Sequence, residues 1–138
     1  MINLGNLQLC TTCCNEHMTN GSSFAFAHYG SSCYEILLTN LHWQQAQDKC
    51  TQLGGKVLNI TSSEEHIYIK QLLQHYGLKQ EIWLLGYDYP PHLVNATCAV
   101  LEPQLDGRWI VSQCGLIADV TRGVICEYGN IQKELLYL

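Results

Sequence analysis

Residues 98–128 of the chain read CAVLEPQLDGRWIVSQCGLIADVTRGVICEY. Two short apolar runs, 99–101 and 109–111, flank Asp106-Gly107, a dipeptide typical of a reversal between antiparallel strands. Such a ribbon brings Cys98 and Cys114 to the same end, within disulfide reach. A third apolar run, 123–126, carries Cys126, and a disulfide from a core strand to a distant helix would account for this cysteine. The stretch therefore predicts a strand hairpin and a core strand, both held by disulfides.

The length and the cysteines indicate one small, crosslinked domain. The chain has 138 residues and eight cysteines, an even number that favours an oxidising compartment and a disulfide framework. Zinc is the alternative, because Cys10, Cys13, Cys14 and His17 are closely spaced. A closed zinc site usually needs a second ligand pair, and none of the later cysteines forms a close pair, so we favour disulfides and expect no metal.

The charge and hydropathy of the chain exclude several classes of partner. The formal net charge is −5, and no cluster of Lys and Arg is present to replace phosphate counterions, so we expect no nucleic acid partner. No apolar run approaches the length needed to cross a bilayer, and the first ten residues lack the pattern of a signal peptide. We expect an extracellular domain, either cut from a longer protein or processed.

Three sequons agree with an extracellular location. Asn20, Asn59 and Asn95 each begin an Asn-x-Ser/Thr tripeptide and are predicted glycosylation sites.

The order of the expected elements predicts the α+β class. Residues 1–32 are expected to form a cysteine-containing arm with a short hairpin, 33–128 the domain, and 129–138 a tail. Asn40 is the expected N-cap of a first helix, which Gly54-Gly55 ends. Ser62-x-x-Glu65 is the capping box of a second helix. Residues 82–86 are apolar throughout, as a central strand would be, so we expect two helices packed on small antiparallel sheets.

Taken together, residues 33–128 resemble the C-type lectin-like domain. The likeness rests on Trp43, Ala46 and Cys50 in the first helix, on Trp83-Leu-Leu-Gly86, and on the spacing C-x10-W-x4-C-x11-C from Cys98 to Cys126. The sequence around Cys98 and Cys114 is most similar to the natural-killer-cell receptor branch of the family. Only fourteen residues, 84–97, separate Trp83 from Cys98, so the chain looks like a compact member with a short loop.

The resemblance implies a set of disulfides. The two core pairs would be Cys50–Cys126 and Cys98–Cys114. A further upstream cysteine, Cys13 or Cys14, would pair with Cys33. Cys10 and the remaining arm cysteine could join two chains, which implies a homodimer, or could bridge within the arm.

Calcium binding is not expected. Sugar-binding members of the family place Trp-Asn-Asp where this chain has Trp109-Ile110-Val111, and two aliphatic side chains offer no oxygen to calcium. Glu102-Pro103-Gln104 lies after Cys98, outside the position of the family's Glu-Pro-Asn loop motif.

These observations favour a calcium-independent recognition domain that binds a protein, or a glycan, on a cell surface. The expected contact residues lie in the loop after the central strand: Tyr87, Asp88, Tyr89, Pro90, Pro91 and His92. The alternative is a calcium-dependent lectin with relocated ligands: Asp88, Glu102 and Asp106. No nucleophile or His-Glu-x-x-His motif indicates an enzyme, and no cofactor is expected. We expect Trp43, Trp83 and Trp109 in the core.

Overall fold

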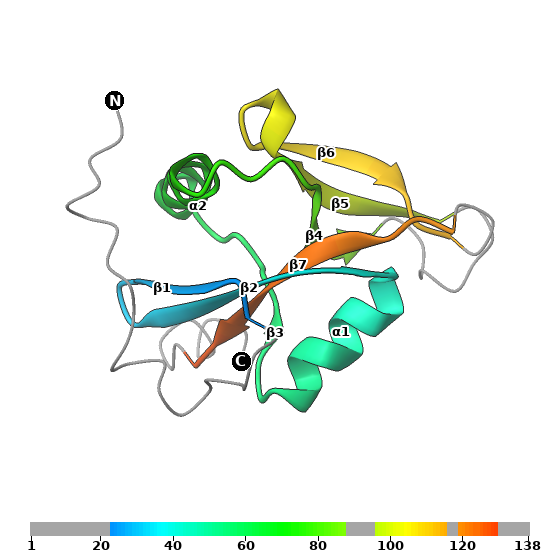
Figure 1. Cartoon of the computed structure of the whole chain (residues 1–138), viewed down its shortest axis with the longest axis horizontal. Coiled ribbons are helices and arrows are strands. Elements are labelled where there is room, and N and C mark those ends of the chain that lie inside the picture. The colour runs from blue at the N-terminus through cyan, green and yellow to red at the C-terminus, as the bar shows by residue number, and fades with distance from the viewer. Residues whose placement is uncertain (1–22, 88–95, 116–118, 130–138) are drawn as a thin grey trace.

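The computed structural model describes residues 23–87, 96–115 and 119–129. One twisted sheet forms its centre, with a helix on each side (Figure 1). The first half of the described chain contains β1 (Ala25–Tyr29), β2 (Ser32–Leu41), α1 (Trp43–Gln52), β3 (Lys56–Val57) and α2 (Ser63–His75). The second half contains β4 (Ile82–Tyr87), β5 (Thr97–Glu102), a 3₁₀ turn η3 (Pro103–Leu105), β6 (Arg108–Gln113) and β7 (Arg122–Tyr128).

The sheet has the strand order β1-β2-β7-β4-β5-β6, and β3 pairs with β7 at one end. β5 and β6 form the antiparallel pair predicted around Asp106-Gly107, in the register Cys98↔Ser112 and Val100↔Ile110. The expectation of an antiparallel sheet is wrong at one place, because β4 and β7 run parallel. In the sheet, β5 and β6 lie on one side of β4 and β7 lies on the other side, so no hairpin joins β4 to β7.

The core lies on both faces of the sheet. Under α1 it contains Trp43, Cys50, Trp83, Val100 and Cys126. Under α2 it contains Ile36, Ile69, Leu72, Leu101 and Ile125. Adjacent residues of β5 and of β7 belong to opposite clusters, as the alternation of side chains along a strand requires. Both helices are therefore needed to cover the central strands.

The start of α1 differs from the prediction. His42, and not Asn40, is the N-cap, and Asn40 lies in β2, which continues to Leu41. Gln45 returns its side-chain oxygen to the His42 N–H at 2.9 Å, which completes a capping box that the sequence pattern did not reveal. The end of the helix agrees with the prediction, since Leu53 is the C-cap and Gly54 follows with φ +87°.

The start of α2 confirms Ser62 as its N-cap, but the return bond of the predicted capping box comes from the Thr61 N–H and not from the Ser62 N–H. The Ser62 hydroxyl accepts a hydrogen bond from the Glu65 N–H at 3.0 Å. The Glu65 carboxylate accepts from the Thr61 N–H at 2.9 Å and from the Tyr34 hydroxyl at 2.5 Å. The buried Glu65 side chain therefore holds the segment before α2 through Thr61 and links α2 to β2 through Tyr34.

Two disulfides join the described elements. Cys50–Cys126 links α1 to β7, and Cys98–Cys114 links β5 to the residue after β6, as the resemblance implies. Cys33 is also disulfide-bonded, and Cys10, Cys13 and Cys14 lie outside the described residues. The predicted arm, residues 1–32, includes β1, which pairs with β2 as a hairpin. No helix in the described ranges has the length and apolar character needed to span a membrane.

Candidate ligand-binding face

The loop expected to contact a ligand is described only at its two ends. Asp88, Tyr89, Pro90, Pro91 and His92 lie outside the described residues, as do the sequons at Asn20 and Asn95. Tyr87 ends β4, where its backbone is paired with Cys98. The far end of the loop joins β5 at Thr97, next to the Cys98–Cys114 disulfide. The assigned contact residues therefore remain predictions, while the strands that carry the loop are fixed.

Strand β6 exposes two large apolar side chains. Trp109 is 48% exposed and Val111 is 63% exposed. Their partners across the β5–β6 pair, Leu101 and Ala99, are buried on the same face of the sheet. The prediction that Trp109 lies in the core is wrong, whereas Trp43 and Trp83 are buried. We call the exposed side of Trp109 and Val111 the β6 face.

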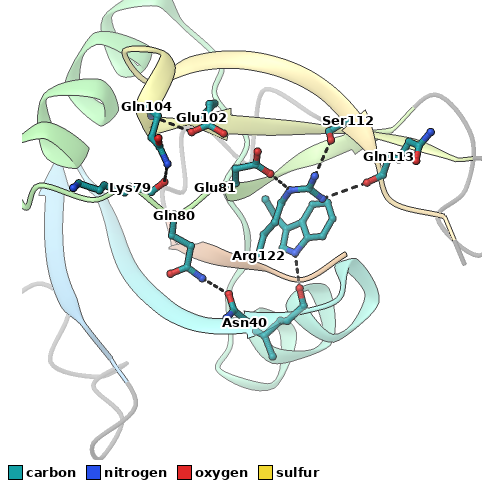
Figure 2. A network of polar contacts seen from close by, with 11 residues as sticks. Asn40, Lys79, Gln80, Glu81, Glu102, Gln104, Ser112, Gln113 and Arg122 are labelled. Atoms are coloured by element: carbon teal, nitrogen blue, oxygen red, sulfur yellow. Dashed lines mark hydrogen bonds and ion pairs between the residues drawn. The ribbon is translucent and has the colours of Figure 1, made fainter. Parts of the chain in front are cut away.

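The other face of β6 is anchored in the molecule. Ile110 packs against the core under α1, and the Ser112 hydroxyl accepts a hydrogen bond from Arg122 Nη2 at 2.7 Å. Arg122 Nη1 also donates to the Gln113 carbonyl at 3.3 Å (Figure 2). Arg122 begins β7, so one side chain connects the edge strand β6 to the centre of the sheet.

Arg122 is itself held by a buried network. Its Nε donates to Glu81 Oε1 at 2.5 Å, and its guanidinium carbon lies 4.3 Å from the centre of the Trp83 ring. The Trp83 indole N–H donates to the Leu41 carbonyl at 2.8 Å. Figure 2 shows Arg122 between Glu81 and the end of β6. The network is an ion pair combined with cation–π stacking, and it fixes the rear of the β6 face.

Glu81 and Glu102 form a hydrogen-bonded carboxyl pair next to this arginine. The bond to Glu102, and then the Arg122 guanidinium, lower the pKa of Glu81. Burial, and then the bond to Glu81, raise the pKa of Glu102. Glu102 also accepts from the Gln104 N–H at 3.0 Å and caps η3.

The turn at Asp106-Gly107 packs against α2. Asp106 has φ +62°, and its carboxylate lies 2.8 Å from the Gln74 side-chain nitrogen and 3.5 Å from Lys70 Nζ. His66 Nε2 lies 3.1 Å from the Gly107 carbonyl. A Cβ on Gly107 would approach the Lys70 side chain to 2.8 Å, so glycine is required by packing as well as by φ +67°.

The residues named as alternative calcium ligands make other contacts in the structure. Glu102 interacts with Glu81 and caps η3, and Asp106 accepts a hydrogen bond from Gln74 of α2. Asp88 lies outside the described residues. Among the residues that the structure describes, no group of three or more His, Cys, Asp or Glu side chains is arranged to hold a metal ion. The positions that carry Asn-Asp in calcium-binding relatives of the fold are occupied by Ile110, which packs on the core, and by exposed Val111.

The residues that sequence reasoning missed are Arg122 and Glu81. Neither belongs to a motif, and they are 41 positions apart in the chain. The available signal was weak: each is a charged residue immediately before an apolar strand, 82–85 or 123–126. Pairing of β4 with β7 brings these two strand starts together, which no local pattern indicates.

Comparison with known proteins gives distant relatives and a clear structural likeness. No family model matches the chain. The chain is 25% identical over 118 residues to the oxidized low-density lipoprotein receptor 1 of Oryctolagus cuniculus; the match covers 77% of this chain and 43% of that receptor. The snake venom toxin convulxin superposes with a TM-score of 0.61 at 14% identity, over 82% of this chain and 98% of the toxin. EMS16, an antagonist of the collagen receptor integrin α2β1, gives a TM-score of 0.60 at 20% identity, over 75% of this chain and 95% of that chain.

Proposed function

We propose, from the premise that this chain carries a C-type lectin-like domain, that it is a calcium-independent extracellular recognition domain whose ligand is a protein on a cell surface. The observation that carries the proposal is the β6 face. At one of the positions where sugar-binding members of the family carry calcium ligands, this chain has Val111, whose exposed apolar side chain lies on the same side of β6 as exposed Trp109.

The chemistry of the β6 face favours a protein ligand. Calcium needs about six to eight oxygen ligands, and neither Ile110 nor Val111 provides one. An exposed tryptophan on a rigid strand offers a large contact area, and tryptophan is enriched among the residues that dominate binding energy in protein interfaces. The names of two similar proteins, a lipoprotein receptor and an integrin antagonist, support a role in recognising large ligands.

The first test concerns calcium. We expect the melting temperature of the purified, oxidised chain to be unchanged when a chelator is replaced by millimolar calcium, because ligand binding to the native state raises the melting temperature by mass action. A clear upward shift would favour the alternative of a calcium-dependent lectin with relocated ligands.

The second test concerns the ligand. Fluorescent tetramers of the chain should stain a subset of cells in the presence of a chelator, and protease treatment of those cells should remove the staining. Trp109→Ala should weaken the binding by about tenfold or more, the range of interface hot spots. Phe24→Ala is the matched control, because Phe24 is 46% exposed but precedes β1, at the opposite end of the sheet from β6. Equal loss in the two variants, or loss of staining only after glycosidase treatment, would contradict the assignment of the β6 face to a protein ligand.

We also propose that the chain forms a homodimer through its N-terminal arm. The arm contains Cys10, Cys13 and Cys14, of which one is needed for an intrachain bridge to Cys33 according to the family pattern. Non-reducing electrophoresis that shows a band of twice the monomer mass would support a crosslink through the remaining cysteines. A single monomer band together with monomeric light scattering would contradict the dimer.

A further inference from the structure

The outer edge of β6 has unpaired backbone groups. β6 is the last strand in the order of the sheet, and its register with β5 has no irregularity. The Cys114 N–H donates to the Ala96 carbonyl at 3.1 Å, so these two residues form a hydrogen-bonded pair of the antiparallel ladder. Such pairs recur at every second residue along the strands. Even-numbered residues of β6 exchange hydrogen bonds with β5, so the N–H and C=O groups of Trp109 and Val111 point away from it. In the described part of the chain, no strand pairs with this side of β6.

The same two residues expose their side chains. Trp109 and Val111 therefore combine outward-pointing backbone groups with exposed apolar side chains. Natural sheets usually protect such an edge with proline, lysine, a bulge or a covering segment. β6 has the sequence RWIVSQ, which contains neither proline nor lysine. An unprotected edge of this kind is a template for strand addition.

We propose that the outer edge of β6 accepts an extended segment of a protein partner as an added strand. This inference rests on the proposed function as a protein-recognition domain and defines the kind of ligand. The backbone groups of Trp109 and Val111 would make hydrogen bonds to the segment, and β-branched or aromatic side chains at two alternate positions would cover the β6 face.

The charges on β6 and on the whole chain favour a different protein, and not a second copy of this chain, as the source of the added strand. Arg108 begins β6 and is exposed, and β6 contains no acidic residue. In an antiparallel pair of two β6 strands, Arg108 of each copy would face the far end of the other, where Ser112 and Gln113 carry no charge. The net charge of −5 on each copy also opposes self-association. A segment with an acidic residue near one end would instead pair with Arg108.

The probe is a capped peptide of about seven residues, the usual length of a strand, in which valine and threonine alternate and one glutamate stands near an end. Two N-methylated versions carry methyl groups on the valine or on the threonine amides. Because the backbone groups of Trp109 point outward, the residue opposite it in an antiparallel added strand must point its own N–H at β6. That residue shares the face of Trp109 and is a valine, so methylation of the valines should weaken binding by about tenfold or more, while methylation of the threonines is tolerated.

The protein side of the test uses the oxidised full chain. Val111→Pro removes only an N–H that points away from β5, and proline is tolerated at the free side of an edge strand. Val111→Thr keeps the N–H and is the control. We expect the peptide to slow hydrogen exchange at the Trp109 and Val111 amides, and Val111→Pro to weaken binding about tenfold or more relative to Val111→Thr.

Several results would overturn the strand-addition proposal. Equal affinity of the two methylated peptides, unchanged exchange at both amides, or a chain that pairs with itself through β6 in light scattering would each do so. If Val111→Pro does not fold, the methylated peptides still decide the question on the unmodified chain. Cell staining that Val111→Pro leaves intact would refute strand addition and retain the recognition function, whereas peptide binding without any cell staining would refute the recognition function itself.

Discussion

Replacement of Arg122 by methionine should destabilise the domain more than any change at an exposed charge. The Arg122 side chain is 4% exposed and makes three polar contacts: with the Glu81 carboxylate, the Ser112 hydroxyl and the Gln113 carbonyl. Methionine keeps the apolar contact with the Trp83 ring but supplies no donor. The change therefore leaves Glu81 without its cation and removes the link between β6 and β7.

The expected cost follows from the burial of the two partners. Removing one member of a fully buried ion pair costs about 3–5 kcal/mol. Glu81 retains 34% exposure, so water can solvate part of the charge left behind. We therefore expect a loss of about 2–4 kcal/mol in the free energy of unfolding.

Urea denaturation with the disulfides intact, followed by circular dichroism, measures this loss. The double variant Glu81→Gln/Arg122→Met should cost less than the sum of the two single variants, because no charge remains unpaired. Lys79→Met, at an exposed lysine nearby, should change the free energy of unfolding by less than about 0.5 kcal/mol.

The pH dependence of the free energy of unfolding gives an independent check that the Glu81–Arg122 pair stabilises the fold. The pKa of Glu81 is lowered in the folded chain, so its contribution is present above the ordinary carboxyl value of 4.5 and is lost as the pH falls through the lower folded pKa. The cost of Arg122→Met should therefore be smaller at acid pH than at neutral pH. A cost below about 1 kcal/mol at neutral pH, or strict additivity in the double variant, would refute the argument that the ion pair is buried and coupled.

Three smaller predictions follow from other contacts. Burial raises the pKa of Tyr68 to about 12, and its hydroxyl has no hydrogen-bond partner among the described residues, so Tyr68→Phe should stabilise the domain by about 1 kcal/mol in the same urea assay. Tyr34→Phe removes a bond to a buried carboxylate and should destabilise the domain by about 1–2 kcal/mol. Gly55→Ala should lower the stability by about 2–3 kcal/mol, because its Cβ would lie 2.7 Å from a backbone carbonyl of β7; an unchanged denaturation midpoint would contradict the packing. The hydrogen bond to Asp119 raises the pKa of His42, so this contact stabilises the fold below the ordinary histidine value of 6.5 and weakens as the pH rises, and Asp119→Asn should lower the His42 pKa in an NMR titration.

Much of the fold could be predicted because its signals are local. Ser62 and Glu65 mark the start of α2 by a side-chain bond within one helical turn. The Asp106-Gly107 turn sets the β5–β6 register from two residues whose backbone takes positive φ. The apolar face of α1 follows from helical spacing and places Cys50 in the core. In each case, the residues that determine the element lie within the element or next to it.

The errors concern properties that depend on distant parts of the chain. Asn40 has the chemistry of an N-cap, but β2 pairs with β7 as far as Leu41 and so delays the start of α1 to His42. The parallel contact of β4 with β7 depends on the path of the intervening hairpin. The Arg122–Glu81 pair depends on that same contact, so it could not be anticipated before the strand order was known.

The candidate site itself shows why strand order matters. Trp83 and Trp109 both lie in short apolar runs, and local sequence assigns both to the core. β4 has a neighbour on each side and helices over both faces, so Trp83 is fully buried; β6 has one neighbour, so Trp109 is left half exposed. The polar residues Arg108, Ser112 and Gln113 around the second run were the only local sign of an edge strand. The apolar surface proposed for recognition is therefore a consequence of the position of β6 at the end of the sheet, and the same position leaves its backbone open to an added strand.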